Sequence, residues 1–344
     1  MPLGFRAGCP GICRRTAVRA DSPWEARLRT HASLWSRLLM GGLSMLMVLA
    51  GLSCSSAAGQ QEGGTQGKQG DGAPAWKQVW TDSFDGPANT GVSTRYWEYS
   101  ASHGTFGTNE VETTTTSTRN VHLDGHGNLD ITALGHGAAS NPGNAWTSGR
   151  IQTKSGGYAA PAGGEMMVTA SIRQPGVPHG LGYWPGFWML GPSRGWPATG
   201  EIDIMENVDG YSKVSGTLHC GNLTQQNPDG TFGPCHEKNG LGSGLQSCVG
   251  CLQSFHTYTV IIDRRHAGHE QIRWYLDGHE FYSVSESRVG AAAWTPAVDH
   301  GFSILLSVGM GGAFPDVQCR CSSPTSQTSS GGTMVVRYVS VSTN

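Results

Sequence analysis

The segment from residue 200 to 207, GEIDIMEN, places three carboxylates in a run of apolar residues. This composition is typical of a buried β-strand, in which side chains two positions apart share one face, as Glu201 and Asp203 would. Glu206 would point to the opposite face unless one extra residue, a β-bulge near Ile204 and Met205, turned it to the same side. Because like charges on one face repel each other, a sheet that only needed to fold would not carry them. The segment therefore predicts a functional site on a β-sheet.

A pair of carboxylates that flanks a substrate is the arrangement used in glycoside hydrolysis. The alternative for an E-x-D-x-x-E pattern is a solvated edge strand or a helix. Aromatic residues nearby favour sugar binding, because the apolar face of a sugar ring stacks on an aromatic ring. Trp184 and Trp196 lie beside proline and glycine, and we expect them to line a cleft. For Trp188, core packing and a cleft position remain open.

The composition of the chain indicates an all-β fold with many turns. Of its 344 residues, 51 are glycine and 17 are proline, and long helical periodicities are few. Residues 121–124 and 128–131 alternate at period two around a glycine turn, and residues 272–276 and 281–284 flank an Asp-Gly turn. The net charge of −2 offers no basic surface for nucleic acid.

The motifs WPGFWML at 184–190 and GWPATGEIDIMEN at 195–207 resemble glycoside hydrolase family 16. Further matches follow in the family's order, at residues 76–86, 107–110, 127–133, 147–151, 216–219, 255–258, 274–278 and 311–315. The resemblance implies a catalytic domain over residues 76–344. It also implies a β-jelly-roll sandwich of two curved antiparallel sheets, the concanavalin A-like lectin and glucanase fold, with a concave substrate cleft.

The same resemblance implies roles for individual residues. Glu201 would be the nucleophile and Glu206 the general acid/base of a retaining enzyme, with Asp203 between them. The expected sugar-binding residues are Asn109, Arg150, Trp184, Trp196 and His219. A turn-capping Asn109, a surface Arg150 and a structural His219 are the alternatives. The bulged E-x-D-x-x-E form favours β-1,3-glucan as substrate; a galactan hydrolase, a transglycosylase and a non-catalytic β-glucan-binding protein are the other interpretations.

The first 58 residues differ in composition from the rest and are expected to be an export leader. Residues 1–37 contain seven arginines and no lysine, and an apolar run follows at 38–52. Cleavage after residues 56–58 would release a secreted, extracellular protein, whereas acylation of Cys54 would anchor it to the membrane as a lipoprotein. Residues 59–75 are expected to form a flexible linker.

Six cysteines remain in the expected catalytic domain, and an even number in an exported chain favours disulfides. The pairs closest in sequence are Cys220–Cys235, Cys248–Cys251 and Cys319–Cys321, although six cysteines allow 15 pairings. The alternative is a zinc site, with ligands from Cys220, Cys235, His236, Cys248 and Cys251. We expect the glycine-rich segment 220–252 to form a loop at the rim of the cleft.

No metal or other cofactor is expected. Many members of glycoside hydrolase family 16 carry a structural calcium ion on the convex side. It is held by an acidic residue near the first strand and an Asp in the last strand. Here Ser83 and Arg337 stand at those positions. A cation beside a guanidinium is unfavourable, so calcium is predicted to be absent. A monomer that acts on a polysaccharide is expected.

Overall fold

The computed structural model describes residues 75–103, 107–136, 146–192 and 195–344. The expected leader at 1–58, the linker up to residue 74 and Cys54 lie outside the described residues. In the described ranges, no helix combines the length and the apolar character needed to cross a membrane.

The first of two sheets is built mainly from antiparallel neighbours, with one parallel pair, β4 and β7. Its order is β17-β16-β15-β9-β19-β6-β7-β4-β3, with β1 paired to β19 and β5 to β6. Its strands are β1 (Lys77–Asp82), β3 (Ser102–His103), β4 (Glu112–Thr114), β5 (Val121–Leu123), β6 (Leu129–Gly135), β7 (Trp146–Ser148), β9 (Glu165–Arg173), β15 (His256–Asp263), β16 (Gln271–Leu276), β17 (His279–Ser285) and β19 (Gly332–Thr343).

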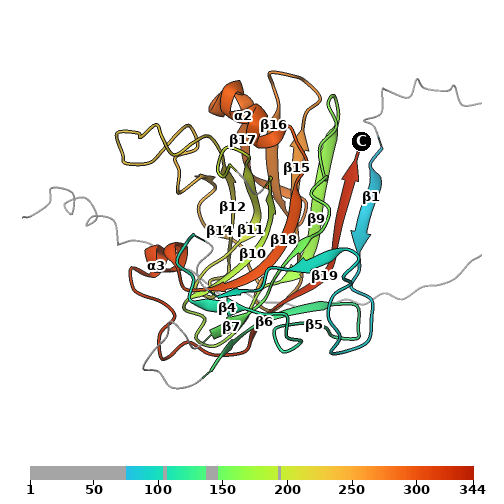
Figure 1. Ribbon diagram of the computed structural model, residues 1–344, viewed down its shortest axis with the longest axis vertical. Helices are drawn as coiled ribbons and strands as arrows, with labels where there is room; N and C mark the ends of the chain where they lie inside the picture. Colours follow the sequence, from blue (N-terminus) through green and yellow to red (C-terminus); the bar gives the residue numbers. More distant parts are fainter. Residues whose placement is uncertain (1–74, 104–106, 137–145, 193–194) are drawn as a thin grey trace, which may run out of the picture. The chain divides into compact units, whose positions relative to one another are not determined.

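The second sheet carries the GEIDIMEN segment in its middle and is antiparallel throughout. Its order is β13-β12-β11-β10-β18-β8-β2, with β14 paired to β12. Its strands are β2 (Trp97–Tyr99), β8 (Arg150–Thr153), β10 (Tyr183–Leu190), β11 (Glu201–Glu206), β12 (Lys213–His219), β13 (Leu241–Gly242), β14 (Gln246–Ser247) and β18 (Ser303–Met310). Strand β11 therefore has a neighbour on each side, and the predicted all-β sandwich is confirmed (Figure 1).

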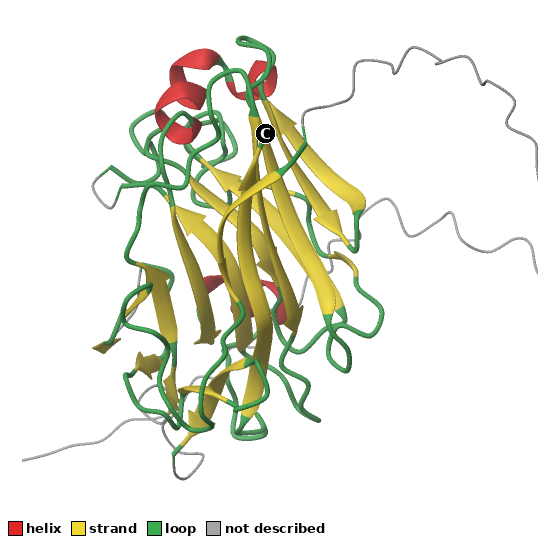
Figure 2. Ribbon diagram, turned by 90° about the vertical axis from the view of Figure 1, so that its right-hand side faces the viewer, coloured by secondary structure: helices red, strands yellow, loops and turns green. Residues whose placement is uncertain are grey.

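The described part of the chain has three short helices: α1 (Glu286–Val289), α2 (Ala291–Val298) and α3 (Ala313–Cys319). Figure 2 shows α1 and α2 together at one end of the strands. The core lies between the two sheets, where alternation sends one face of each strand inward. In β10, for example, Tyr183, Phe187 and Met189 are buried, while Trp184 and Trp188 are half-buried on the opposite face.

Both predicted hairpins are present. β5 pairs with β6, and β16 pairs with β17 across Asp277 and Gly278. These two turn residues have φ angles of 50° and 78°, and a two-residue turn of this kind requires positive φ at both positions.

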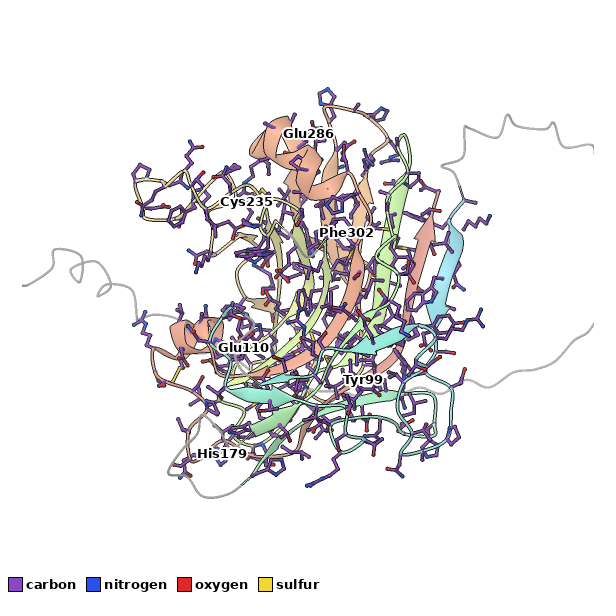
Figure 3. The ribbon with its side chains drawn as sticks, viewed as in Figure 1. Tyr99, Glu110, His179, Cys235, Glu286 and Phe302 are labelled. Atoms are coloured by element: carbon purple, nitrogen blue, oxygen red, sulfur yellow. A yellow bond between two sulfur atoms is a disulfide. The ribbon has the colours of Figure 1, made fainter. Side chains whose placement is uncertain are left out.

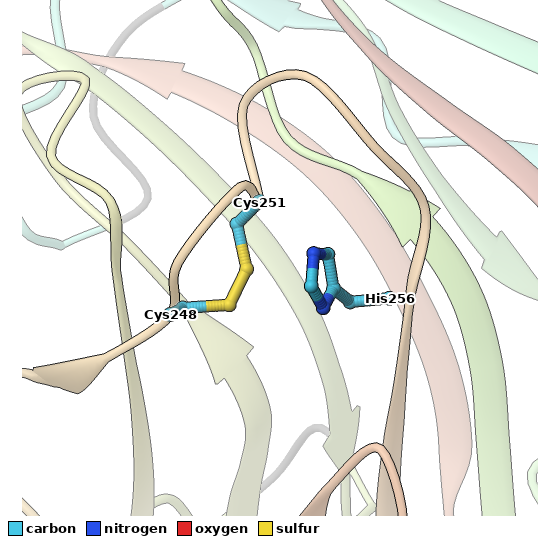
Figure 4. A group of neighbouring side chains, drawn as sticks. All are labelled: Cys248, Cys251 and His256. Atoms are coloured by element: carbon cyan, nitrogen blue, oxygen red, sulfur yellow. A yellow bond between two sulfur atoms is a disulfide. The ribbon is translucent and has the colours of Figure 1, made fainter. Parts of the chain in front are cut away.

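All three expected disulfides, Cys220–Cys235, Cys248–Cys251 and Cys319–Cys321, occur in the structure. With these disulfides formed, the zinc alternative is wrong, because cysteines that are bonded to each other do not supply thiolate ligands. His256 lies beside the Cys248–Cys251 pair (Figure 4). Its Nδ1 is 2.7 Å from Asp277 Oδ2, so the ring is held by the β16–β17 turn.

Candidate active site

A β-bulge in β11 brings the three carboxylates together. Glu201 is opposite His219 and Asp203 is opposite Thr217, but Glu206 is opposite Ser215, so three steps along β11 match two along β12. The pairing with β10 shifts at the same place. The extra residue falls at Ile204–Met205, as predicted, and both of these side chains are buried in the core.

The bulge is supported from the first sheet. Trp274 of β16 is fully buried and donates its indole N–H to the backbone carbonyl of Asp203 over 2.8 Å. A buried carbonyl without a partner is costly. Trp274 therefore stabilises the position at which β11 departs from regular pairing.

The side chains of the bulged strand meet on one face of the second sheet, which we call the site face. Glu206 Oε1 accepts a hydrogen bond from Trp184 Nε1 over 2.8 Å. Asp203 Oδ2 lies 3.4 Å from His219 Nε2. Ligand atoms of Glu201, Asp203 and His219 lie within 4.8 Å of one another. The structure thus places all three predicted carboxylates in a single interacting group.

Burial and mutual repulsion shift the acidity of this group. Burial raises the pKa of Glu201 to about 7, with a further contribution from the Asp203 charge, while His219 and Arg150 favour the ionised form. Burial also holds the pKa of Glu206 well above its usual range, again with Asp203 adding to the effect. Glu201 is therefore the group of this pair with more cationic neighbours to support its negative charge.

Arg150 belongs to the site face, where it is half-buried. Its guanidinium lies 4.6 Å from the centre of the Trp188 ring. Burial lowers its pKa, and the charges of Glu201, Glu110 and Glu112 oppose that shift. Arg150 therefore supplies a positive charge beside the carboxylates.

Three tryptophans surround the group at different depths. Trp184 contacts Glu206 directly, as described above. Trp196 is 37% exposed and favours the ionised form of Glu201, and its ring centre is 5.8 Å from that of His219. Trp188, left open by the sequence, lies on the site face with its indole N–H donated to Ser307 Oγ over 3.2 Å. An exposed ring beside the carboxylates offers a surface on which a sugar could stack.

Asn109 is not brought into contact with the carboxylates. It is exposed and has a φ of 68° in the loop that precedes Val111. That loop is joined to the start of α3 by a hydrogen bond of 2.7 Å from Ala313 N to Thr108 O. Its role in sugar binding stays a prediction.

Sequence reasoning missed three acidic residues near the site. Glu110 lies next to the start of α3 (Figure 3). A β-carbon added at Gly312, just before α3, would be 3.2 Å from the backbone nitrogen of Glu110. Glu112 is 3% exposed and accepts a hydrogen bond from Met310 N, and burial raises its pKa to about 7. Because residues two positions apart share one face of a strand, the position of Glu110 could have indicated Glu112. Glu237 is buried and contacts His219; it lies in residues 220–240, the loop between β12 and β13, which has no periodic pattern that could have indicated it. The rest of the expected loop 220–252 contains the short strands β13 and β14, which pair with β12.

The described residues offer two groups of potential metal ligands: Glu201, Asp203 and His219, and Cys248, Cys251 and His256. The second includes a disulfide pair. At the expected calcium position, the Arg337 guanidinium lies 3.8 Å from the centre of the Phe255 ring. The prediction that the protein needs no calcium stays a prediction.

Comparisons with known proteins agree with this geometry. Residues 111–248 match a family model described as the XgeA-like catalytic GH16 domain. The solved endo-1,3-β-glucanase of Streptomyces sioyaensis is 41% identical, with a TM-score of 0.69 over 79% of this chain and 99% of that one. A β-glucanase of Rhodothermus marinus is 29% identical over 71% of this chain and 79% of its own length.

The glucan endo-1,3-β-glucosidase A1 of Niallia circulans is 28% identical over 69% of this chain. The match spans only 34% of that relative, about a third of its length. The near-complete match to the Streptomyces sioyaensis enzyme, joined to the bulged strand and its three carboxylates, places this chain in glycoside hydrolase family 16, in its laminarinase-like group.

Proposed function

We propose that the protein is an endo-acting, retaining β-1,3-glucanase that hydrolyses β-glucan by double displacement. The observation that carries the proposal is the bulge in β11, which turns Glu206 to the face that holds Glu201 and Asp203. Without the extra residue, the second glutamate of the pair would point into the core.

The electrostatics support different roles for the two glutamates. A general acid must hold a proton at working pH, and burial together with Asp203 keeps the pKa of Glu206 well above its usual range. A nucleophile must be ionised, and Arg150 and His219 favour the ionised form of Glu201. Two carboxyl groups whose surroundings separate their proton affinities are the pattern expected for acid and nucleophile.

In the first step, a Glu201 oxygen attacks the anomeric carbon while Glu206 gives its proton to the departing glycosidic oxygen. The products are a glycosyl ester on Glu201, a shortened glucan with a new hydroxyl, and an ionised Glu206. In the second step, Glu206 takes a proton from water, the hydroxide oxygen attacks the anomeric carbon, and Glu201 leaves as a carboxylate. The Trp184 N–H stabilises the ionised form of Glu206 between the two steps.

Two features favour β-1,3-glucan as the substrate. The E-x-D-x-x-E spacing with its bulge resembles laminarinase-like members, whereas lichenases have the shorter E-x-D-x-E form. The Streptomyces sioyaensis and Niallia circulans relatives are both named for 1,3-β-glucan cleavage. Trp184, Trp188 and Trp196 would provide stacking surfaces for successive glucose rings.

The test is product analysis on laminarin, lichenan and agarose. We expect laminarin to be cut internally, giving a mixture of oligosaccharides whose new ends are first seen in the β-configuration by proton NMR. Products that appear first in the α-configuration would refute the retaining mechanism. Preferential cutting of agarose would favour a galactan hydrolase, and products longer than the starting chains, with added oligosaccharide acceptor, would favour a transglycosylase.

We also propose that the enzyme acts outside the cell as a monomer. Three disulfides in the catalytic domain support an oxidising compartment. Fractionation of producing cells with the Cys54→Ala variant tests the anchor: release of the variant from a membrane-bound wild type supports lipidation. Identical soluble fractions would instead support cleavage after residues 56–58.

A further inference from the structure

Glu237, which belongs to the loop 220–240 between β12 and β13, contacts the site face through His219. Its side chain is buried, and its Oε2 lies 2.8 Å from His219 Nδ1. Its Oε1 accepts a hydrogen bond of 2.8 Å from the backbone N–H of Cys220. The backbone of Glu237 is paired in both directions with Phe232 at 2.7 Å. The position of this carboxylate is therefore fixed from both its side chain and its backbone.

The loop itself is tied to the end of β12 close to this contact. The disulfide between Cys220 and Cys235 joins the residue after His219 to a residue two positions before Glu237. A Cβ on Gly240 would come within 2.9 Å of the His219 ring, so the loop backbone also covers one edge of the imidazole. The ring thus lies between the loop on one side and β11 on the other.

On the β11 side, His219 Nε2 is 3.4 Å from Asp203 Oδ2. That oxygen is buried and, in the described part of the chain, has no hydrogen bond of good geometry. Ionised carboxylates only accept hydrogen bonds, so a ring between two of them is best matched when both nitrogens carry hydrogen. A charged His219 is then the cation that compensates the charge of Asp203.

The other acidic groups that face His219 also favour its protonated form. Glu201 is its partner across the strands, and the charge of Glu206 also interacts with it. Burial alone would lower the pKa of His219. The neighbouring carboxylates of Asp203 and Glu237 outweigh that effect, and the pKa of His219 lies well above its ordinary value.

We propose that Glu237 is a positioning residue, which holds His219 as an imidazolium against Asp203 so that Glu201 stays ionised and the proton of the carboxylate group stays on Glu206. The inference rests on the proposed function, in which Glu206 is the acid. A neutral His219 would remove a positive charge that favours the ionised form of Glu201, and Glu201 would then compete with Glu206 for the proton. The loop that carries Glu237 would thereby control the acid step without touching the substrate.

The decisive variant is Glu237→Gln, which keeps the shape of the side chain and an oxygen for Cys220 N–H but removes the charge. His219 is followed by NMR in histidine-labelled protein, with its signal assigned by loss in His219→Gln. In the wild type, we expect His219 to stay protonated through neutral pH. In Glu237→Gln, His219 should lose its proton at lower pH than in the wild type. Above that pH, kcat on laminarin should fall about tenfold, as expected for loss of a charged hydrogen bond.

Two companion variants separate positioning from folding. Glu237→Asp keeps the charge and should restore protonation of His219 over much of the range. Asp229→Asn changes an exposed carboxylate of the same loop, 3.4 Å from His236, and should leave the pH profile of kcat unchanged. KM should change little in any of them, because the Glu237 side chain is fully buried and Asp229 lies in the outer part of the loop.

An unchanged His219 titration and an unchanged pH profile in a folded Glu237→Gln protein would overturn the proposal. If that variant does not fold, the wild type alone decides, because a His219 that is neutral at pH 7 is incompatible with it. If the wild type does not cleave laminarin, the proposed function fails on its own, and the His219 titration still tests the contact with Glu237.

Discussion

Trp184 and Glu206, on the neighbouring strands β10 and β11, are joined by a hydrogen bond of 2.8 Å from the indole Nε1 to the carboxylate Oε1. The donor cannot accept a proton, so the bond favours the ionised form of Glu206. It therefore opposes burial and the Asp203 charge, both of which favour the protonated form. In the proposed retaining mechanism Glu206 alternates between the two forms, and this contact favours the ionised one.

Replacement of Trp184 by Phe should keep the edge-on packing against Phe314 but remove the donor. The pKa of Glu206 should then rise further, and the alkaline limb of the kcat profile should move to higher pH. The second step of the proposed mechanism needs an ionised Glu206, so kcat near neutral pH should fall about tenfold, as expected for loss of a hydrogen bond to a charged group. Steady-state kinetics across pH measure both effects.

The matched control is Trp188→Phe. Trp188 donates to Ser307 and not to a carboxylate, so its loss should leave the alkaline limb in place even if substrate binding weakens. Equal shifts in both variants would show that the aromatic surface, and not the Trp184 hydrogen bond, governs the pH dependence.

Loss of either proposed catalytic glutamate should abolish hydrolysis with little effect on folding. Glu201→Gln and Glu206→Gln should each lower kcat on laminarin by roughly a thousandfold or more, within the range for loss of acid–base or nucleophilic catalysis. Glu98→Gln is the control, because Glu98 is an exposed residue of the same sheet that bonds Gln152. Circular dichroism should show the same fold in all three proteins.

Azide distinguishes the two roles. On an activated aryl glycoside, Glu206→Ala should still form the glycosyl-enzyme, and azide should restore turnover because a small anion needs no general base. The expected product is a β-glycosyl azide. Glu201→Ala lacks the proposed nucleophile, so azide should restore its activity with formation of an α-glycosyl azide. If Glu206→Ala gave the α-azide and Glu201→Ala gave the β-azide, the two assignments would be exchanged.

Much of the architecture follows from local patterns, because strand alternation and turn residues act over a few positions. The β16–β17 hairpin and the bulge at Ile204–Met205 are of this kind: each is determined by spacing within one short segment. The contact between Trp274 and the Asp203 carbonyl is different, since it joins strands 71 residues apart. Glu237 escaped prediction for the same reason, because only the folded loop brings it to His219.

The stability of the protein should depend on pH through Glu112. Its side chain is 3% exposed, and burial raises its pKa from 4.5 to about 7. The folded state therefore binds a proton more tightly than the unfolded state, and the free energy of unfolding should fall as pH rises from 4.5 to about 7. The shift corresponds to about 3 kcal/mol.

Glu112→Gln removes this dependence while an amide oxygen can still accept from Met310 N. The variant should be more stable than the wild type above pH 7, and the difference should shrink toward pH 4.5. Urea unfolding at several pH values measures it, with Glu98→Gln as the exposed control. A stability difference that is the same at pH 5 and pH 8 would contradict the raised pKa.

Reductant, and not chelator, should lower the melting temperature. The Cys220–Cys235 bond closes a loop with a sequence separation of 15, for which chain entropy predicts a stabilisation of about 3 kcal/mol. The other two bonds close separations of 3 and 2 and should contribute less. The Cys220→Ser/Cys235→Ser variant should therefore melt roughly 10 °C lower, with a smaller change for Cys319→Ser/Cys321→Ser. Ethylenediaminetetraacetic acid should change nothing if Arg337 and Ser83 exclude calcium; a chelator-dependent loss of several degrees would show a bound cation.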